Sequence, residues 1–454
     1  MARPRTITLQ DLGPPLRGRA PVSAVELAAV LRVNRTTIHR ALNGFGDQLV
    51  KMGATRRTRY ALRRELPGAG NQWPLFRIDA AGGVIEWARL EALHDRLWRV
   101  SWLEDAPAWA GQFANREGLW HGFPWFLGDV RPQGFLGRAI ARQSSRALRV
   151  PEDPRQWGDD DTLVFLQAAG EDVPGDLVLG EDCLRRALAR AAVPETRAEA
   201  DFPELAAQAA STTSGTSAGG EQPKFSLTLR DPAGLPCEML VKFSPPLDQA
   251  TGRRWADLLL AEYHAHAVLE RAGLGLAGVR IHDVGGRRFL MVPRFDRTPD
   301  GGRRGTVSLE SLHAAAIGSL PRDWPAAMES LVGAGLADRQ EIAKVRHLHA
   351  FGELIGNTDM HLGNLSFWWD DALPFRVAPA YDMLPMLWAP GPQGELVTRT
   401  FAPLPPVPAM REAWQETAGW AAEFWRNLTV DERLSEEFAV IARRARPTAL
   451  AISR

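Results

Sequence analysis

The spacing of apolar positions along the chain predicts a series of helices separated by short strands. Near the start, Ser23 and Glu26 form a capping-box pattern ahead of a first helix that ends near Leu31. A second helix is predicted from Arg35 to Leu42, closed by Asn43-Gly44. The apolar face of the first helix is supplied by Val25, Leu27, Ala28, Val30 and Leu31. Longer helical patterns cover 183–192, 195–210, 255–273, 308–316, 338–354 and 411–446.

Short runs rich in apolar and β-branched residues predict strands between these helices. Glycine-containing turns at 80–83 and 285–286 join neighbouring runs into hairpins. The segment 90–98 fits a helix or a strand. The strand-like runs lie at 49–53, 58–62, 75–78, 84–87, 225–229, 239–243, 279–284 and 289–292. This mixture predicts an α+β protein.

Composition places the chain among ordinary globular proteins. It has 454 residues, an apolar fraction of 45% and no net charge, so roughly two to three domains are expected. Its two cysteines provide no disulfide framework, which favours a reducing, cytoplasmic location. The first residues lack the apolar stretch of a signal peptide, and no run of about 18 apolar residues predicts a membrane span.

Charge is distributed unevenly between the N-terminal end and the rest. Residues 1–66 hold thirteen lysines and arginines against four acidic residues, a net charge of +9, so the remainder carries −9. Such an asymmetry is typical of a segment that binds a polyanion.

The predicted helices 23–31 and 35–42, with a short turn between them, have the outline of a helix-turn-helix. The two strands at 49–53 and 58–62 would add the wing of a winged helix. Side chains suited to base edges and phosphates are Arg35, Thr36, Thr37, His39 and Arg40 on the second helix, with Arg56, Arg57 and Arg59 in the wing. We therefore predict a DNA-binding domain at 1–66; the alternative is a basic helical hairpin that packs on the rest of the chain.

The stretch Gly356–Phe367 contains Asp359 and Asn364 five residues apart, with His361 between them. Asp-x-x-x-x-Asn is the spacing of a protein-kinase catalytic loop, where the Asp orients the acceptor hydroxyl and the Asn holds magnesium. The same spacing occurs by chance in many loops, so its weight depends on the flanking segments. Downstream, Asp382 follows Tyr381 and supplies a second carboxylate.

Upstream of that stretch, a Ser/Thr/Gly-rich segment runs from Ser211 to Gly220 and leads into Lys224. Composition alone favours a flexible linker, but backbone amides in such a segment can also bind phosphates. Lys242 lies in the apolar run 239–243 that follows. The chain has only four lysines, and Lys224 and Lys242 are the two placed where an ammonium would meet phosphate oxygens.

Five motifs in this order resemble the HipA-type serine/threonine kinases, toxins of bacterial toxin–antitoxin systems, over roughly residue 72 to the C-terminus. The motifs are 217–224 (SAGGEQPK), 241–243 (VKF), 292–297 (VPRFDR), 357–364 (NTDMHLGN) and 381–382 (YD). The N-terminal addition resembles the YjjJ-like branch. The resemblance implies a two-lobed kinase core with ATP and Mg²⁺ as cofactors. It also implies a protein substrate such as an aminoacyl-tRNA synthetase, whose phosphorylation arrests growth.

The resemblance also implies roles for individual residues. Asp359, Lys242 and Asn364 would be catalytic, Asn364 and Asp382 would hold the metal, and Ser217 would be autophosphorylated. By analogy with protein kinases, Glu262 on the predicted helix 255–273 would pair with Lys242. Proline stands at 293 where relatives often have Glu. Nucleotide-binding positions would be Ala218, Gly219, Gly220, Glu221, Gln222, Lys224, Lys242, Pro293, Arg294, Phe295, His361, Tyr381 and Asp382.

These inferences give three expected domains and two competing functions. We expect a winged helix-turn-helix domain at 1–66, a HipA-type N-terminal subdomain at 71–200 and a kinase core at 201–454, with lobes at about 205–297 and 298–454. The middle subdomain is expected to be structural. The favoured function is a serine/threonine protein kinase toxin fused to a DNA-binding module, and dimerisation on DNA is a further expectation. The alternatives are a DNA-binding regulator whose kinase fold only senses nucleotide, and a kinase for a small metabolite.

Overall fold

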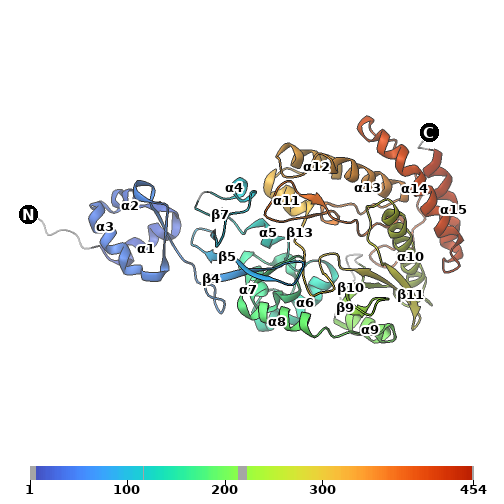
Figure 1. Ribbon diagram of the computed structural model, residues 1–454, viewed down its shortest axis with the longest axis horizontal. Coiled ribbons are helices and arrows are strands. Elements are labelled where there is room, and N and C mark those ends of the chain that lie inside the picture. The colour runs from blue at the N-terminus through green and yellow to red at the C-terminus, as the bar shows by residue number, and fades with distance from the viewer. Residues whose placement is uncertain (1–6, 116, 213–221, 452–454) are drawn as a thin grey trace, which may run out of the picture.

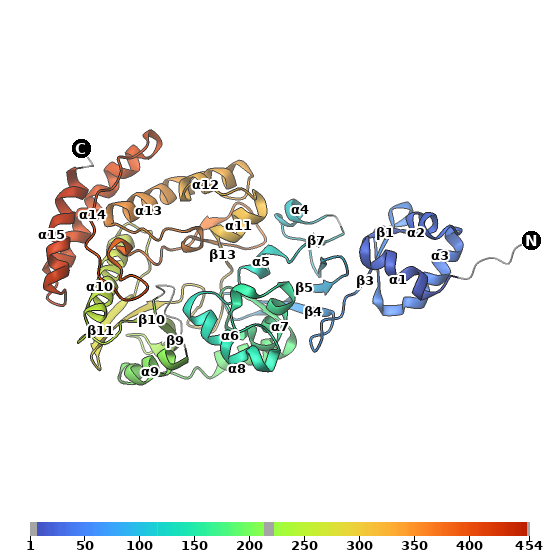
Figure 2. The ribbon, with the colours of Figure 1, turned by 180° about the vertical axis from the view of Figure 1, so that it is seen from behind.

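The computed structural model describes residues 7–115, 117–212 and 222–451 and shows a mixed α/β chain. The structure is elongated, with α1 (Leu9–Gly18) at one end of its long axis and α15 (Glu436–Ala451) at the other (Figures 1 and 2). Between them lie a five-stranded sheet with its helices, a four-stranded sheet, and a mainly helical C-terminal part. None of the helices in the described ranges is long and apolar enough to cross a membrane.

The N-terminal part has its own small sheet and core. The two predicted helices are α2 (Ala24–Leu31) and α3 (Arg35–Leu42), and Ser23 and Asn34 cap them through side-chain bonds to the backbone N–H groups of Glu26 and Thr37. Three antiparallel strands in the order β1-β3-β2 complete the part: β1 (Val22–Ser23), β3 (Arg59–Leu62) and β2 (Leu49–Met52). Its core contains Leu12, Leu16, Leu27, Ile38, Leu42 and Tyr60.

The predicted apolar face of α2 is wrong at two positions. Val25 and Val30 are 54% and 51% exposed, whereas Leu27 is buried. This helix has only eight residues, and its apolar side chains point to more than one side of it. The small core accepts Ala24 and Leu27, with Ala28 and Leu31 at its margin, and it leaves the other side in solvent.

A five-stranded antiparallel sheet forms the middle of the molecule, in the order β7-β6-β5-β4-β8. The segment 90–98, which the sequence left open, contains the end of one strand and the start of the next, joined at Asp95 and Arg96 with positive φ. The strands are β4 (Gln72–Ile78), β5 (Val84–Ala92), β6 (Leu97–Trp102), β7 (Leu119–His121) and β8 (Leu177–Leu179). The helices are α4 (Ala110–Phe113), α5 (Trp125–Gly128), α6 (Gly134–Leu148), α7 (Asp159–Ala169) and α8 (Glu181–Ala192).

Two apolar clusters join this middle part to its neighbours. On one side, Val50, Met52 and Ala61 of the N-terminal part pack with Leu93 and Leu97, and Arg63 forms an ion pair with Glu91. On the other side, aromatic rings from the middle part surround Trp369 of the C-terminal part: Trp87, Trp109, Trp125 and Phe126. The middle part is therefore the structural bridge of the chain.

The four-stranded antiparallel sheet has the order β11-β12-β10-β9 and packs between two helices. These helices are α9 (Phe202–Thr212) and α10 (Ala250–Arg271), and the strands are β9 (Lys224–Arg230), β10 (Pro236–Phe243), β11 (Arg280–Val284) and β12 (Arg287–Pro293). The helix predicted at 195–210 begins only at Phe202. Thr196 instead bridges Thr228 of β9, and the backbone of Arg197 bonds the same residue, so this segment is extended.

The C-terminal part is mainly helical. Its helices are α11 (Leu309–Ala316), α12 (Trp324–Gly333), α13 (Glu341–Ile355), α14 (Arg411–Val430) and α15, and a small sheet of β13 (Thr306–Ser308), β14 (Ser366–Trp368) and β15 (Arg376–Val377) lies among them. The apolar spacing did not predict α12, which is capped by Asp323 and starts with Trp324-Pro325.

Candidate active site

Lys242 of β10 and Glu262 of α10 form a buried ion pair. Along β10, Met239, Val241 and Phe243 enter the core toward α9, so the alternation of the strand turns Lys242 to the opposite face, toward α10. The Lys242 Nζ lies 2.6 Å from Glu262 Oε1, and the two side chains are 5% and 1% exposed. The predicted pairing of these residues is confirmed.

Asp382 also contacts the Lys242 ammonium. Burial alone would lower the pKa of Lys242, but the carboxylates of Asp382 and Glu262 outweigh burial and raise it. Burial alone would raise the pKa of Asp382, but Lys242 and Lys224 hold it well below its usual range. Lysine and carboxylates are therefore charged at neutral pH, which is the state needed to bind phosphate oxygens and a cation.

Local backbone geometry places Asp382 beside the stretch 356–367. Asp382 has a left-handed φ of 53°, and Gly356 ends α13 in the same region, with φ 78°. Asn357 lies buried between the two segments: its Nδ2 donates to the Asp382 carbonyl at 3.2 Å, and its Oδ1 accepts from the Asp359 N–H at 3.0 Å. Asn357 thus fixes the position of Asp359 relative to Asp382, a role that the sequence analysis did not assign although the residue lies in the same motif.

Asn364 and His361 hold the remainder of this loop. Asn364 Nδ2 donates to the Asp359 carbonyl at 2.8 Å. His361 Nδ1 accepts from the Gly363 N–H at 3.1 Å, so this ring is used within the loop. The Tyr381 hydroxyl donates to the Gly363 carbonyl at 2.8 Å. The loop is therefore braced from the two sides of Asp359, whose side chain is at an exposed position.

The residues expected to bind phosphates lie partly outside the described ranges. This applies to Ser217, Ala218, Gly219, Gly220 and Glu221. Gln222 and Lys224 are described. The Gln222 Nε2 donates to the Phe243 carbonyl at 2.6 Å, and Lys224 stands opposite Lys242 in the pairing of β9 with β10. The positive charges of Lys242 and Lys224 lower the pKa of the Asp382 carboxyl group.

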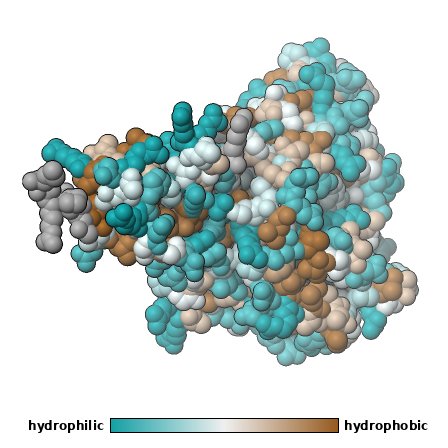
Figure 3. Space-filling view, turned by 60° about the vertical axis from the view of Figure 1, so that its left-hand side comes forward, coloured by the Kyte–Doolittle hydropathy of each residue, from teal (hydrophilic) through white to brown (hydrophobic). Residues whose placement is uncertain are grey.

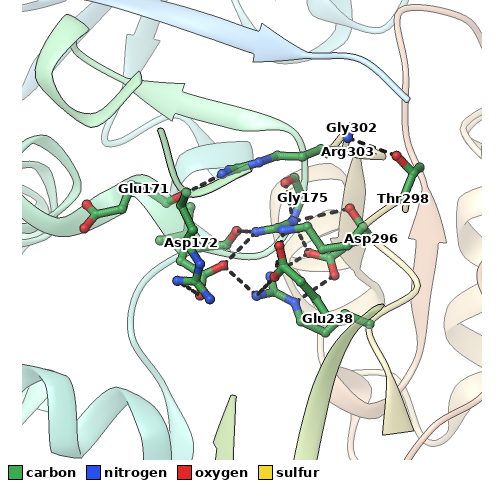
Figure 4. Close-up of polar contacts among 12 residues, drawn as sticks. Glu171, Asp172, Gly175, Glu238, Asp296, Thr298, Gly302 and Arg303 are labelled. Atoms are coloured by element: carbon green, nitrogen blue, oxygen red, sulfur yellow. Dashed lines mark hydrogen bonds and ion pairs between the residues drawn. The ribbon is translucent and has the colours of Figure 1, made fainter. Parts of the chain in front are cut away.

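The segment 293–297 joins the four-stranded sheet to the C-terminal part. Phe295 stacks on Tyr381, with ring centroids 5.9 Å apart. The guanidinium of Arg294, which was expected to contact nucleotide, is instead bonded to three carboxylates: Asp172 at 2.6 Å, Asp296 at 3.0 Å and Glu238 at 3.3 Å. Arg297 forms ion pairs with the same three carboxylates. We call Asp172, Glu238, Arg294, Asp296 and Arg297 the hinge ion cluster (Figure 4).

The donor set of this site fits a magnesium ion. Magnesium prefers carboxylate and amide oxygens. Asn364 contacts the Asp359 carbonyl through its Nδ2, and Asp382 contacts Lys242 through its Oδ1. In the described part of the chain, Asn364 Oδ1 and Asp382 Oδ2 form no hydrogen bond. These two oxygens are therefore available for a metal that also contacts phosphates.

The N-terminal helix α3 presents its polar side chains outward. Arg35, Thr36, His39 and Arg40 are exposed, whereas Thr37 is half-buried and its hydroxyl bonds Asn34. Arg56 and Arg57 are exposed between β2 and β3. Hydrophilic side chains cover much of this part in the space-filling view (Figure 3). Arg59 is different because its guanidinium bonds the Pro21 carbonyl at 2.9 Å and approaches Glu26.

Comparisons with known proteins agree with the motif order. Residues 69–188 match the model of the YjjJ-like toxin middle domain, and residues 216–446 match that of the HipA-like C-terminal domain. A curated protein, Toxin YjjJ of Escherichia coli (strain K12), is 35% identical over 430 residues, covering 93% of this chain and 94% of the relative.

Two solved structures are also similar. One is a chain of the Shewanella oneidensis MR-1 complex of HipA, HipB and operator DNA, with a TM-score of 0.45 and 16% identity, covering 83% of this chain and 96% of that chain. The other is the Helicobacter pylori proinflammatory kinase CtkA, with a TM-score of 0.34 and 12% identity, covering 50% of this chain and 92% of that chain.

Proposed function

Because the chain belongs to the family of YjjJ-like toxins with a HipA-like C-terminal domain, we propose that it is an ATP- and magnesium-dependent serine/threonine protein kinase. The observation that carries the proposal is the convergence of Lys242, Glu262 and Asp382 beside the loop that holds Asp359 and Asn364. Phosphoryl transfer needs a cation for the phosphates, oxygens for magnesium and a carboxylate for the acceptor hydroxyl.

Each side chain then has one task. Lys242, oriented by Glu262, would bind phosphate oxygens, and Asn364 Oδ1 with Asp382 would hold the metal, which neutralises phosphate charge when bound. Asp359 would orient the acceptor hydroxyl and accept its proton. Asp382 bonds Lys242 directly, so binding of a nucleotide would redistribute these contacts. Asn357 hydrogen-bonds the backbone of both Asp382 and Asp359, so it would fix the position of the metal-binding group relative to the proton-accepting group.

We further propose that Ser217 is the site of self-modification, as the family resemblance implies. A phosphate there would add about −1.5 to −2 charges to a segment that leads to Lys224 and the nucleotide site, and it would oppose the binding of another polyanion. This makes the enzyme a kinase that limits its own activity.

The test is label transfer from γ-labelled ATP. Purified protein incubated with magnesium should become labelled, and chelation of the metal with EDTA should abolish the label. Ser217→Ala should remove the label from the chain while transfer to an added protein substrate persists. Absence of label on wild type, with ATP binding still measurable by calorimetry, would contradict the kinase and favour a DNA-binding regulator that senses nucleotide.

We also propose that residues 7–66 bind DNA. Exposed cations lie on α3 and in the β2–β3 connection, and a helix-turn-helix geometry would place α3 in the major groove. The chain itself would then recognise its operator DNA.

Arg35→Ala combined with Arg40→Ala should weaken binding to DNA and reduce the slope of log K against log salt by about one for each lost phosphate contact. The measurement is a fluorescence-anisotropy titration at several salt concentrations with DNA from the upstream region of the gene. Arg411→Ala, an exposed arginine at the start of α14, is the matched control and should leave the titration unchanged. An unchanged affinity and slope in the double variant would exclude α3 as the DNA-binding helix.

A further inference from the structure

His266 is a buried histidine on α10, one helical turn after Glu262. The two side chains share one face of the helix, because residues four apart are neighbours on a helix surface. His266 is 1% exposed, and its Nε2 lies 3.7 Å from Glu262 Oε1. The roles proposed above for Lys242, Glu262 and Asp382 leave this ring without a task.

Neither ring nitrogen of His266 has a hydrogen-bond partner among the residues that the structure describes. A neutral imidazole carries one N–H donor, whichever of its two forms is present. A buried donor without an acceptor costs free energy, and most such groups in proteins are paired. His266 therefore has a donor available for an acceptor close by.

Glu262 has an acceptor that matches this donor. Its Oε1 accepts from the Lys242 ammonium at 2.6 Å, whereas its buried Oε2 has no partner within the described ranges. Burial alone would raise the pKa of Glu262, but Lys242 and, after it, His266 hold that pKa below its usual value. The carboxylate is therefore ionised at neutral pH, with one oxygen bonded to Lys242 and the other still without a donor.

The orientation of Glu262 matters because Lys242 contacts two carboxylates in this structure, those of Glu262 and Asp382. In the proposed mechanism Asp382 holds the metal when nucleotide is bound, so Glu262 becomes the carboxylate that orients the ammonium. A carboxylate bonded through one oxygen can still rotate about its last side-chain bond. A second hydrogen bond, from a neighbouring side chain, would stop that rotation.

We propose that His266 is a positioning residue that donates a hydrogen bond to Glu262 and thereby fixes Lys242 for phosphate binding. An approach of roughly 0.5–1 Å between the two side chains would bring their 3.7 Å separation to hydrogen-bond length. The inference rests on the proposed kinase function, because it adds a residue to the same site. His266 acts through Glu262 and Lys242, with no contact of its own to the nucleotide.

The experiment compares His266→Leu with His266→Gln in label transfer from γ-labelled ATP. Leucine fills the buried volume but has no donor, whereas glutamine keeps an N–H donor. His266→Leu should lower kcat/KM for ATP roughly tenfold or more, the loss expected for a hydrogen bond to a charged group. The affinity for magnesium-ADP, measured by calorimetry, should fall as well, because Lys242 is proposed to bind phosphate oxygens of either nucleotide. His266→Gln should recover most of both losses, which an imidazole that only fills space does not predict.

His264→Leu is the matched control on the same helix. Its ring contacts Asp431 at 2.9 Å, so this substitution removes a histidine contact of α10 that does not involve Glu262. Transfer rate and ADP affinity should stay at the wild-type level. Urea unfolding followed by tryptophan fluorescence checks the fold of every variant, and His266→Met takes the place of His266→Leu if the leucine variant does not fold.

Glu262→Met tests whether His266 acts through Glu262. In that background His266→Leu should cause little further loss, because the acceptor is already absent. The inference is overturned if His266→Leu keeps the wild-type rate and affinity, if His266→Gln loses as much as His266→Leu, or if the loss is undiminished in Glu262→Met. Absence of transfer in wild type would instead contradict the proposed kinase. The ADP affinities of the same variants then decide, and equal affinity in wild type and His266→Leu, or no binding in either, would overturn the role of His266.

Discussion

Asp359→Ala is expected to lower the rate of phosphate transfer from ATP by about 10²- to 10⁴-fold, the usual contribution of a positioned general base. The substitution removes a side chain at an exposed position. The backbone contacts of residue 359 to Asn357 and Asn364 do not involve the carboxylate. These two backbone contacts remain in the variant, so its fold should be retained.

The measurement is the initial rate of label transfer, with ADP affinity and the thermal unfolding midpoint determined on the same preparations. Thr358→Ala is the matched control, because it truncates the neighbouring exposed side chain of the same loop. It should retain the wild-type rate. Equal rates in Asp359→Ala and wild type would remove Asp359 from the catalytic role and would leave the motif spacing as a coincidence.

The pair Lys242–Glu262 was predicted by analogy with protein kinases, and the sequence pattern supplied only the strand and the helix that carry the two residues. The alternation of β10 assigns Lys242 to one face, and the helix that follows supplies the carboxylate. By contrast, the bridging role of Asn357 depends on two positive-φ turns, at Gly356 and Asp382, which come together only in the folded chain. No local sequence pattern encodes the contact between these two distant turns.

The same limit explains two wrong predictions: the apolar face of α2 and the start of the helix predicted at 195–210. Apolar spacing predicts which residues of α2 have a preference for burial, but the size of the available core decides that Leu27 is inside and Val30 is not. Thr196 and Arg197 are extended because they pair with Thr228, more than 30 residues away in sequence. In each case a tertiary contact overrides a local preference.

Two arginines of similar burial are expected to differ sharply in their effect on stability. Arg294→Met should lower the free energy of unfolding by about 3–5 kcal/mol, because it leaves the buried Asp296 and the half-buried Asp172 and Glu238 with fewer positive partners. The cost of breaking a buried pair comes mainly from the charges that remain. Because Asp172 belongs to the middle part and Asp296 to the segment after β12, the loss should also loosen the junction of these parts.

Arg303→Met provides the comparison, since the same substitution is made nine residues away beside the same cluster. Arg303 has no carboxylate partner in the described ranges, so its removal leaves no carboxylate unpaired. We expect a change in the free energy of unfolding of less than about 1 kcal/mol, or a gain in stability. Urea unfolding followed by tryptophan fluorescence measures both variants. Similar losses in the two variants would mean that stability depends on arginine packing rather than on charge pairing.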